Sequence, residues 1–246
     1  MAAEPAGKPE DNTTSIRRSL QTLLTKISHG SAPFITTFLL IHLSAPILAN
    51  IGGSSLASQV MILGREYYQT SFGEKYLVLA PLVVHPCSSI LKRLLAPKPA
   101  RRLSSILSLT AYAAVLIVPL HFLIHRVYPA DPLPPVDAVG PAELDYEFVK
   151  AALNKWPWRS WLAYIALTTC VAWHAAEGMS IIWNTWLKGT TGNWKSGAKR
   201  RAVAAVLTIT PVLTGIFVMA REPPMVFAST AARYHAAMRK LFYYRL

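Results

Sequence analysis

Residues 33–51 read PFITTFLLIHLSAPILANI and contain no charged side chain. A helix crosses the hydrocarbon core of a bilayer with about 20 apolar residues, because it satisfies its own backbone hydrogen bonds there. Gly52 and Gly53 follow and break the apolar run. The stretch therefore predicts a membrane-spanning helix, and it decides the fold class of the chain.

Four further apolar runs cover about residues 76–91, 103–124, 158–186 and 202–220. Tryptophans border the fourth run at both ends, as in the aromatic belts of membrane interfaces. We predict an all-α membrane protein with a bundle of five transmembrane helices over residues 31–222. A polar tail, residues 1–30, precedes the bundle, and its basic amphipathic part, residues 16–27, is expected on the membrane surface. A basic aromatic tail, residues 223–246, follows.

The composition agrees with a membrane protein: 52% of the residues are hydrophobic and 15% are charged. A soluble domain usually has about a quarter charged residues. The net charge of +13 suits nucleic-acid binding in principle, but the Lys and Arg residues flank apolar runs instead of forming one face with aromatics. We therefore exclude nucleic acid and expect the basic loops to attract membrane lipids.

Five spans place the two termini on opposite sides of the membrane. The loop after the second span, residues 92–102, and the loop after the fourth, residues 187–201, contain Lys and Arg but no Asp or Glu. Because basic loops favour the cytosolic side, the sequence predicts a cytosolic N-terminus.

One histidine lies in each of the first four spans: His42, His85, His121 and His174. Ionisable residues at membrane depth usually face the interior of the bundle. Neutral imidazoles on facing helices are what bis-histidine ligation of haem b requires. The expected axial pairs are His85 with His174, or His42 with His121, and Gly178 would let a flat ligand approach one turn beyond His174. Hydrogen bonding between helices is the alternative role of these histidines.

The first and third spans share a spacing of residues. In each, a hydroxyl residue is followed by alanine, an apolar residue stands seven positions on, and a histidine stands eleven positions on: Ser31, Phe38 and His42, and Thr110, Ile117 and His121. The shared spacing indicates an internal duplication, in which spans one and two correspond to spans three and four.

Two short motifs resemble the cytochrome b anchor subunits of succinate dehydrogenase and fumarate reductase. Ser31 to His42 fits their first-helix pattern, and His174 to Gly178 fits their His-x-x-x-Gly pattern. The resemblance implies a b-type haem protein that exchanges electrons with a quinone. The residues after Gly178, MSIIW, depart from the arginine-rich continuation of that superfamily, which puts haem-propionate and quinone contacts in doubt.

A second resemblance covers nearly the whole chain. The order of elements is similar to the fungal mitochondrial outer-membrane adaptor family, found as multicopy suppressors of lost ER–mitochondria tethering. The residues that carry it are His42-Leu43 with Gly52-Gly53, Arg65-Glu66-Tyr67-Tyr68-Gln69, Pro119-Leu120-His121, His125-Arg126-Val127-Tyr128-Pro129 and Trp173-His174. This family is implied to act in mitochondrial lipid homeostasis by recruiting a bridge-like lipid-transfer protein.

Recruitment in that family is associated with a Pro-x-Pro peptide. Pro97-Lys98-Pro99 fits this spacing on the predicted cytosolic side, although such tripeptides are common and a plain proline-rich connector is the simpler interpretation. The long polar segments contain no nucleophile–base constellation, phosphate loop or metal-ligand spacing. The sequence thus predicts a non-enzymatic adaptor, with haem-dependent electron transfer as the alternative.

Overall fold

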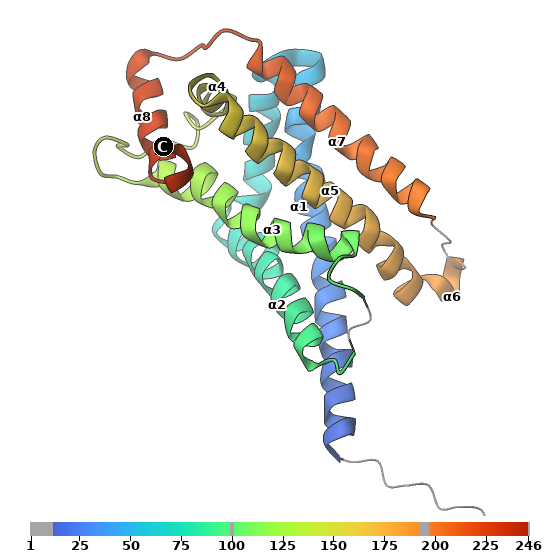
Figure 1. Cartoon of the computed structure of the whole chain (residues 1–246). Helices are drawn as coiled ribbons and strands as arrows, with labels where there is room; N and C mark the ends of the chain where they lie inside the picture. Colours follow the sequence, from blue (N-terminus) through green and yellow to red (C-terminus); the bar gives the residue numbers. More distant parts are fainter. Residues whose placement is uncertain (1–11, 99–100, 192–196, 246) are drawn as a thin grey trace, which may run out of the picture.

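The computed structural model describes residues 12–98, 101–191 and 197–245, and all regular elements in this part of the chain are helical (Figure 1). Five helices are long and apolar enough to cross a membrane: Thr13–Tyr68, Gly73–Leu95, Ile106–Ala130, Pro157–Trp186 and Ala198–Ala220. This confirms the prediction of an all-helical membrane protein, and the number of candidate spans among the described residues equals the five predicted. The last four agree with the predicted runs to within a few residues at each end.

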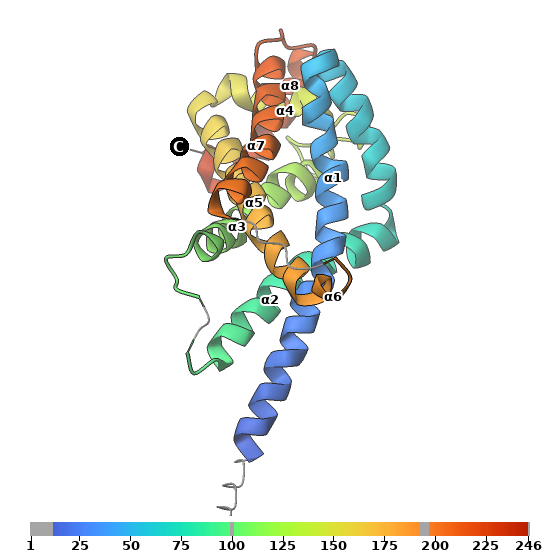
Figure 2. The same cartoon turned by 90° about the vertical axis from the view of Figure 1, so that its right-hand side faces the viewer.

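The first span begins earlier than predicted, whereas the break predicted at Gly52 and Gly53 is confirmed. Helix α1, Asn12–Tyr68, leaves helical geometry only at Gly52 and Gly53, and the φ of 61° at Gly53 lies in the region that favours glycine. The chain reverses there, so that Tyr68 packs against Phe38, with ring centroids 5.2 Å apart (Figures 1 and 2). Residues 16–27, predicted as a separate segment on the membrane surface, are instead the N-terminal continuation of the first span.

The second span returns beside the first arm of α1. It consists of the π-helical η1, Gly73–Leu79, and α2, Ala80–Leu95. The hydroxyls of Ser28 and Ser89 lie 2.8 Å apart, and the Gln21 side-chain amide donates to the Leu95 carbonyl at 3.1 Å. These bonds hold the N-terminal half of α1 against α2.

The remaining spans complete the bundle. They are α3, Ile106–Phe122, with the π-helical η2, Leu123–Val127, and the 3-10 turn η3, Tyr128–Ala130; then α5, Pro157–Trp186, with the short α6, Lys188–Thr191; and α7, Ala198–Ala220. Helix α5 packs on α3 and α7, and α7 crosses α1 (Figure 1). Gly215 lies against the Pro46 carbonyl, where any Cβ would collide. Small residues permit this close approach of two spans.

A cap covers the end of the bundle opposite the start of α1. It is formed by α4, Tyr146–Lys155, α8, Ala228–Arg239, and η4, Phe242–Tyr244 (Figure 1). Phe148, Tyr234 and Met238 are buried in its core. Arg233 pairs with Glu143 at 2.9 Å and, together with the Gly140 N–H, lowers the pKa of the Glu143 carboxyl. The segment after residue 223, predicted as a tail, is therefore docked on the bundle.

A buried ion network joins the cap to the reversal of α1. The Lys150 side chain is buried, and its Nζ lies 2.5 Å from Glu147 and 3.4 Å from Glu222. Glu222 accepts hydrogen bonds from the N–H and the hydroxyl of Ser54. Burial alone would raise the pKa of Glu222, but the bonds from Ser54 and the charge of Lys150 outweigh it and lower the pKa.

Replacing Lys150→Ala is expected to lower the free energy of unfolding by about 3–5 kcal/mol, because Glu147 and Glu222 lose their buried counter-charge. Lys155→Ala removes an exposed lysine of the same helix and is the matched control, with an expected change within about 0.5 kcal/mol. Unfolding of the detergent-purified variants measures both changes. Equal stability of the two variants would contradict the role given to the network.

Candidate functional site: two histidine pairs within the bundle

The first pair joins His85 of α2 to His174 of α5. Their ring centroids lie 6.1 Å apart with the rings nearly perpendicular, at 88°. The Nδ1 of His85 lies 2.9 Å from the Ser28 carbonyl, and the Nδ1 of His174 lies 3.3 Å from the Leu107 carbonyl. Because a carbonyl oxygen can only accept, Nδ1 carries the hydrogen in both rings, and each Nε2 keeps its lone pair.

The second pair joins His42 of α1 to His121 of α3, with ring centroids 6.0 Å apart at 83°. Phe38 stacks on His42 at 5.2 Å, and His125 lies 4.4 Å from His121, one helical turn further on. The buried Nδ1 of His42 has no hydrogen-bond partner among the described residues. This pair is thus a packed aromatic cluster with one unsatisfied ring nitrogen.

Both pairs have the spacing of two imidazoles on one metal, whose centroids lie roughly 6 Å apart because each metal–nitrogen bond is about 2 Å long. A ligating histidine usually donates its other ring N–H to a carbonyl or carboxylate. Only His85 and His174 meet this second requirement. A Cβ at Gly178 would meet no atom within 4 Å, so space is open one turn beyond His174.

Residues 12–98, 101–191 and 197–245 contain no cluster of three or more His, Cys, Asp or Glu that could hold a metal ion directly. A haem needs only two protein ligands, because the porphyrin supplies the other four. The first pair thus meets two requirements of haem ligation, the ring spacing and the tethered Nδ1, whereas the second meets only the spacing and Phe38 covers its His42 ring.

The hydrogen bonds of the first pair extend the internal duplication. Ser28 precedes His42 by 14 residues, and Leu107 precedes His121 by the same 14 residues. The carbonyls that hold His85 and His174 are therefore equivalent positions in the two halves. Each pair also joins equivalent histidines. This agreement in three dimensions supports the duplication that the shared spacing indicates.

Sequence reasoning missed two ion pairs between the spans. Arg126 of η2 binds both carboxylate oxygens of Glu74 in η1, at 2.7 and 3.0 Å. Arg201 of α7 binds Glu177 of α5 at 2.9 Å. Nothing in the sequence connects residues this far apart, since each pairing depends on how the helices pack. His125, in contrast, could have been assigned to the site from its position one turn after His121.

The predicted partner motif gains no structural detail. Pro97 is exposed in the bend that follows α2, and Pro99 lies outside the described residues. A role for this peptide in recruitment stays a prediction.

Fold and site together define a class: a polytopic α-helical membrane protein with histidines paired inside its bundle. Residues 116–225 match the model of the transmembrane domain of MDM10-complementing protein 1. The match supports the resemblance to the fungal adaptor family, and the matched part contains His121, His174 and Glu222. No curated protein and no solved structure matches the chain, so the likeness to cytochrome b anchor subunits stays a prediction.

Proposed function

We propose that the chain is an adaptor of the mitochondrial outer membrane that serves lipid homeostasis by recruiting a bridge-like lipid-transfer protein. The observation that carries the proposal is the match of residues 116–225 to the transmembrane domain of MDM10-complementing protein 1. Three of the segments that carry the family resemblance lie inside the matched part: Pro119-Leu120-His121, His125-Arg126-Val127-Tyr128-Pro129 and Trp173-His174. The protein would act as a platform held by its bundle and not as an enzyme.

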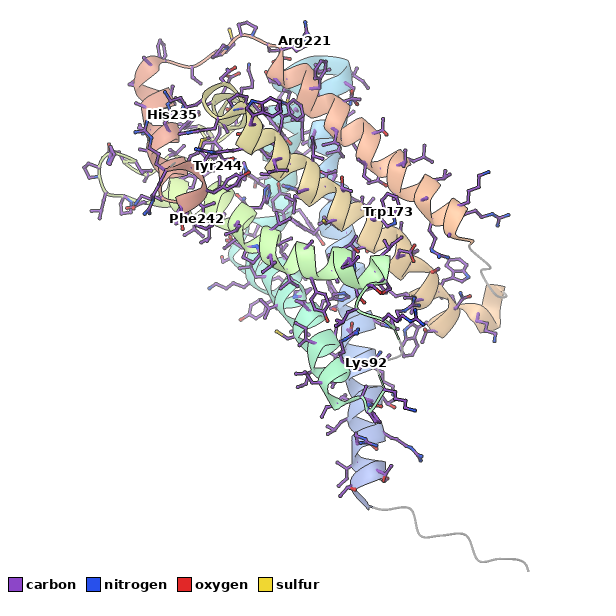
Figure 3. The ribbon with its side chains drawn as sticks, viewed as in Figure 1. Lys92, Trp173, Arg221, His235, Phe242 and Tyr244 are labelled. Carbon is purple, nitrogen blue, oxygen red and sulfur yellow. The ribbon has the colours of Figure 1, made fainter. Side chains whose placement is uncertain are left out.

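The proposed orientation places the start of α1 and the loop after α2 in the cytosol. Lys92 lies towards this end of the molecule, whereas Arg221, His235 and Tyr244 lie towards the opposite end (Figure 3). The connection between the fourth and fifth spans lies on the same side as Lys92. It contains Lys188 and leads into the basic first turn of α7. The excess of basic residues supports the cytosolic assignment of this side.

Recruitment is tested in fungal cells that lack the chain and contain a fluorescent lipid-transfer protein. We expect the mitochondrial fraction of that protein to fall several-fold and to return when the full chain is expressed. Pro97→Ala with Pro99→Ala should impair the return. Pro132-Leu133-Pro134 has the same Pro-x-Pro spacing in the loop after the third span, on the predicted opposite side, so Pro132→Ala with Pro134→Ala should not. Undiminished recruitment without the chain would contradict the proposal.

Protease treatment of intact mitochondria tests the orientation that recruitment needs. An epitope at the N-terminus should be removed, and one at the C-terminus should survive until the outer membrane is opened. The reverse pattern would place the basic loops away from the cytosolic partner.

The geometry of the first pair favours a second function, the binding of haem b. His85 and His174 would hold the haem, the carbonyls of Ser28 and Leu107 would keep their rings oriented, and Gly178 would leave room beside them. A bound haem supplies one-electron redox chemistry. Because the pair lies inside the bundle, haem binding is compatible with an adaptor role of the loops.

The test is a dithionite-reduced minus oxidised spectrum of protein purified from cells with ample haem. We expect the sharp α-band of six-coordinate b haem, its loss in His85→Ala and in His174→Ala, and its survival in the matched variant His42→Ala. A wild-type protein without the band, or a band that persists in both of the first variants, would refute the assignment.

A further inference from the structure

The N-terminal part of α1 extends beyond α3, α5 and α7, and the end of α2 lies beside its last two turns (Figures 1 and 2). The end of α5 marks the membrane interface on this side, since the Trp186 indole donates to His29 at 2.9 Å and tryptophan is enriched at that depth. Between His29 and Thr13 the helix continues for about 24 Å, at 1.5 Å per residue. We call this projecting helix, residues 13–28, the arm.

The arm continues the axis of the first span and therefore points out of the bilayer that this span would cross. It continues the first span without a break, and Gln21 and Ser28 bind it to the end of α2 through Leu95 and Ser89. An amphipathic helix that binds a bilayer lies in the membrane plane. Because the arm follows the direction of its span, its apolar side chains project beside the helix outside the bilayer.

An apolar stripe runs along the arm. Ile16, Leu20, Leu23 and Ile27 are exposed by 56%, 42%, 53% and 37%. Their spacing of four, three and four residues is that of the a and d positions of a heptad repeat, which present one seam to a partner helix. Leu24, on the side that faces α2, is buried instead. An exposed apolar row outside the bilayer marks a surface for another protein.

The charges beside the stripe select the kind of partner. Arg17 and Lys26 are exposed on its two edges, and residues 12–32 contain no Asp or Glu. A second copy of the chain would bring the same cations to the same edges, which disfavours self-association. A helix with Glu or Asp beside its own apolar seam would complement both the stripe and the cations.

We propose that the arm docks an acidic amphipathic helix of a partner protein, with the apolar seam of that helix on Leu20 and Leu23 and its carboxylates beside Arg17 and Lys26. The proposal deepens the adaptor function, because it names the surface through which a cytosolic partner is held. It rests on that function for its biological context only, since the docking can be measured with a defined peptide.

The direct test uses the full chain in detergent and a labelled synthetic helix with Leu at the a and d positions and Glu at e and g. We expect Leu20→Glu with Leu23→Glu to weaken binding at least tenfold. Arg17→Glu with Lys26→Glu should weaken it similarly and create binding of the same peptide with Lys at e and g. Thr22→Glu adds the same carboxylate at an exposed site off the stripe, and its affinity should stay within twofold of wild type.

Three results would overturn the proposal: no binding of the acidic peptide to wild type, equal weakening by Thr22→Glu, or binding that anionic phosphatidylserine vesicles abolish by occupying the arm themselves. All variants change exposed side chains, and unchanged thermal unfolding confirms that each one is folded.

Recruitment in cells separates this proposal from the adaptor function. The Leu20→Glu, Leu23→Glu chain should reach mitochondria and fail to recruit the lipid-transfer protein. If it recruits normally, the docking surface is wrong and the adaptor function stands. If the wild-type chain recruits nothing, the adaptor function fails, and the peptide measurement alone decides whether the arm docks an acidic helix.

Discussion

The side-chain nitrogen of Lys150 lies in a place that excludes water, and a buried polar group of this kind is tolerated only where partners satisfy it. Its partners come from α4 and from the segment after α7, and Glu222 in turn binds the backbone of Ser54 directly after the reversal of α1. The reversal sends the chain into α2, which carries His85. The position of the first histidine pair therefore depends on a network at the far end of the bundle.

Two further ion pairs also hold helices of the bundle against each other, at other levels along the bundle axis. Glu74 and Arg126 tie the second span to the third, and both belong to π-helical segments, where the widened turn changes the direction of side chains. Glu177 and Arg201 tie the fourth span to the fifth. Because an unpaired charge is costly in lipid, each pair fixes one helix against another.

The sequence predicts those features that a bilayer requires of any chain that crosses it. The apolar runs, their number and the histidines at membrane depth follow from the cost of exposing charge and backbone to lipid. The sequence predicts one or the other of the two histidine pairs, and the structure brings both together. The arm and the docked C-terminal segment were not predicted, because residues 16–27 and 223–246 have the composition of surface segments whether or not they pack. The contacts of Lys150 with Glu222 and of Arg126 with Glu74 join distant positions and have no local signal.

The internal duplication has a geometric consequence. His42 meets His121 and His85 meets His174, and under the duplication each is the counterpart of the residue it meets. In a two-fold arrangement, a residue touches its own counterpart only beside the rotation axis. Under the duplication, both pairs are therefore expected along one pseudo-two-fold axis through the first four spans, with α7 outside the symmetry. A ligand bound on that axis would contact two equivalent histidine side chains of one polypeptide, as a ligand does at the centre of a symmetric homodimer.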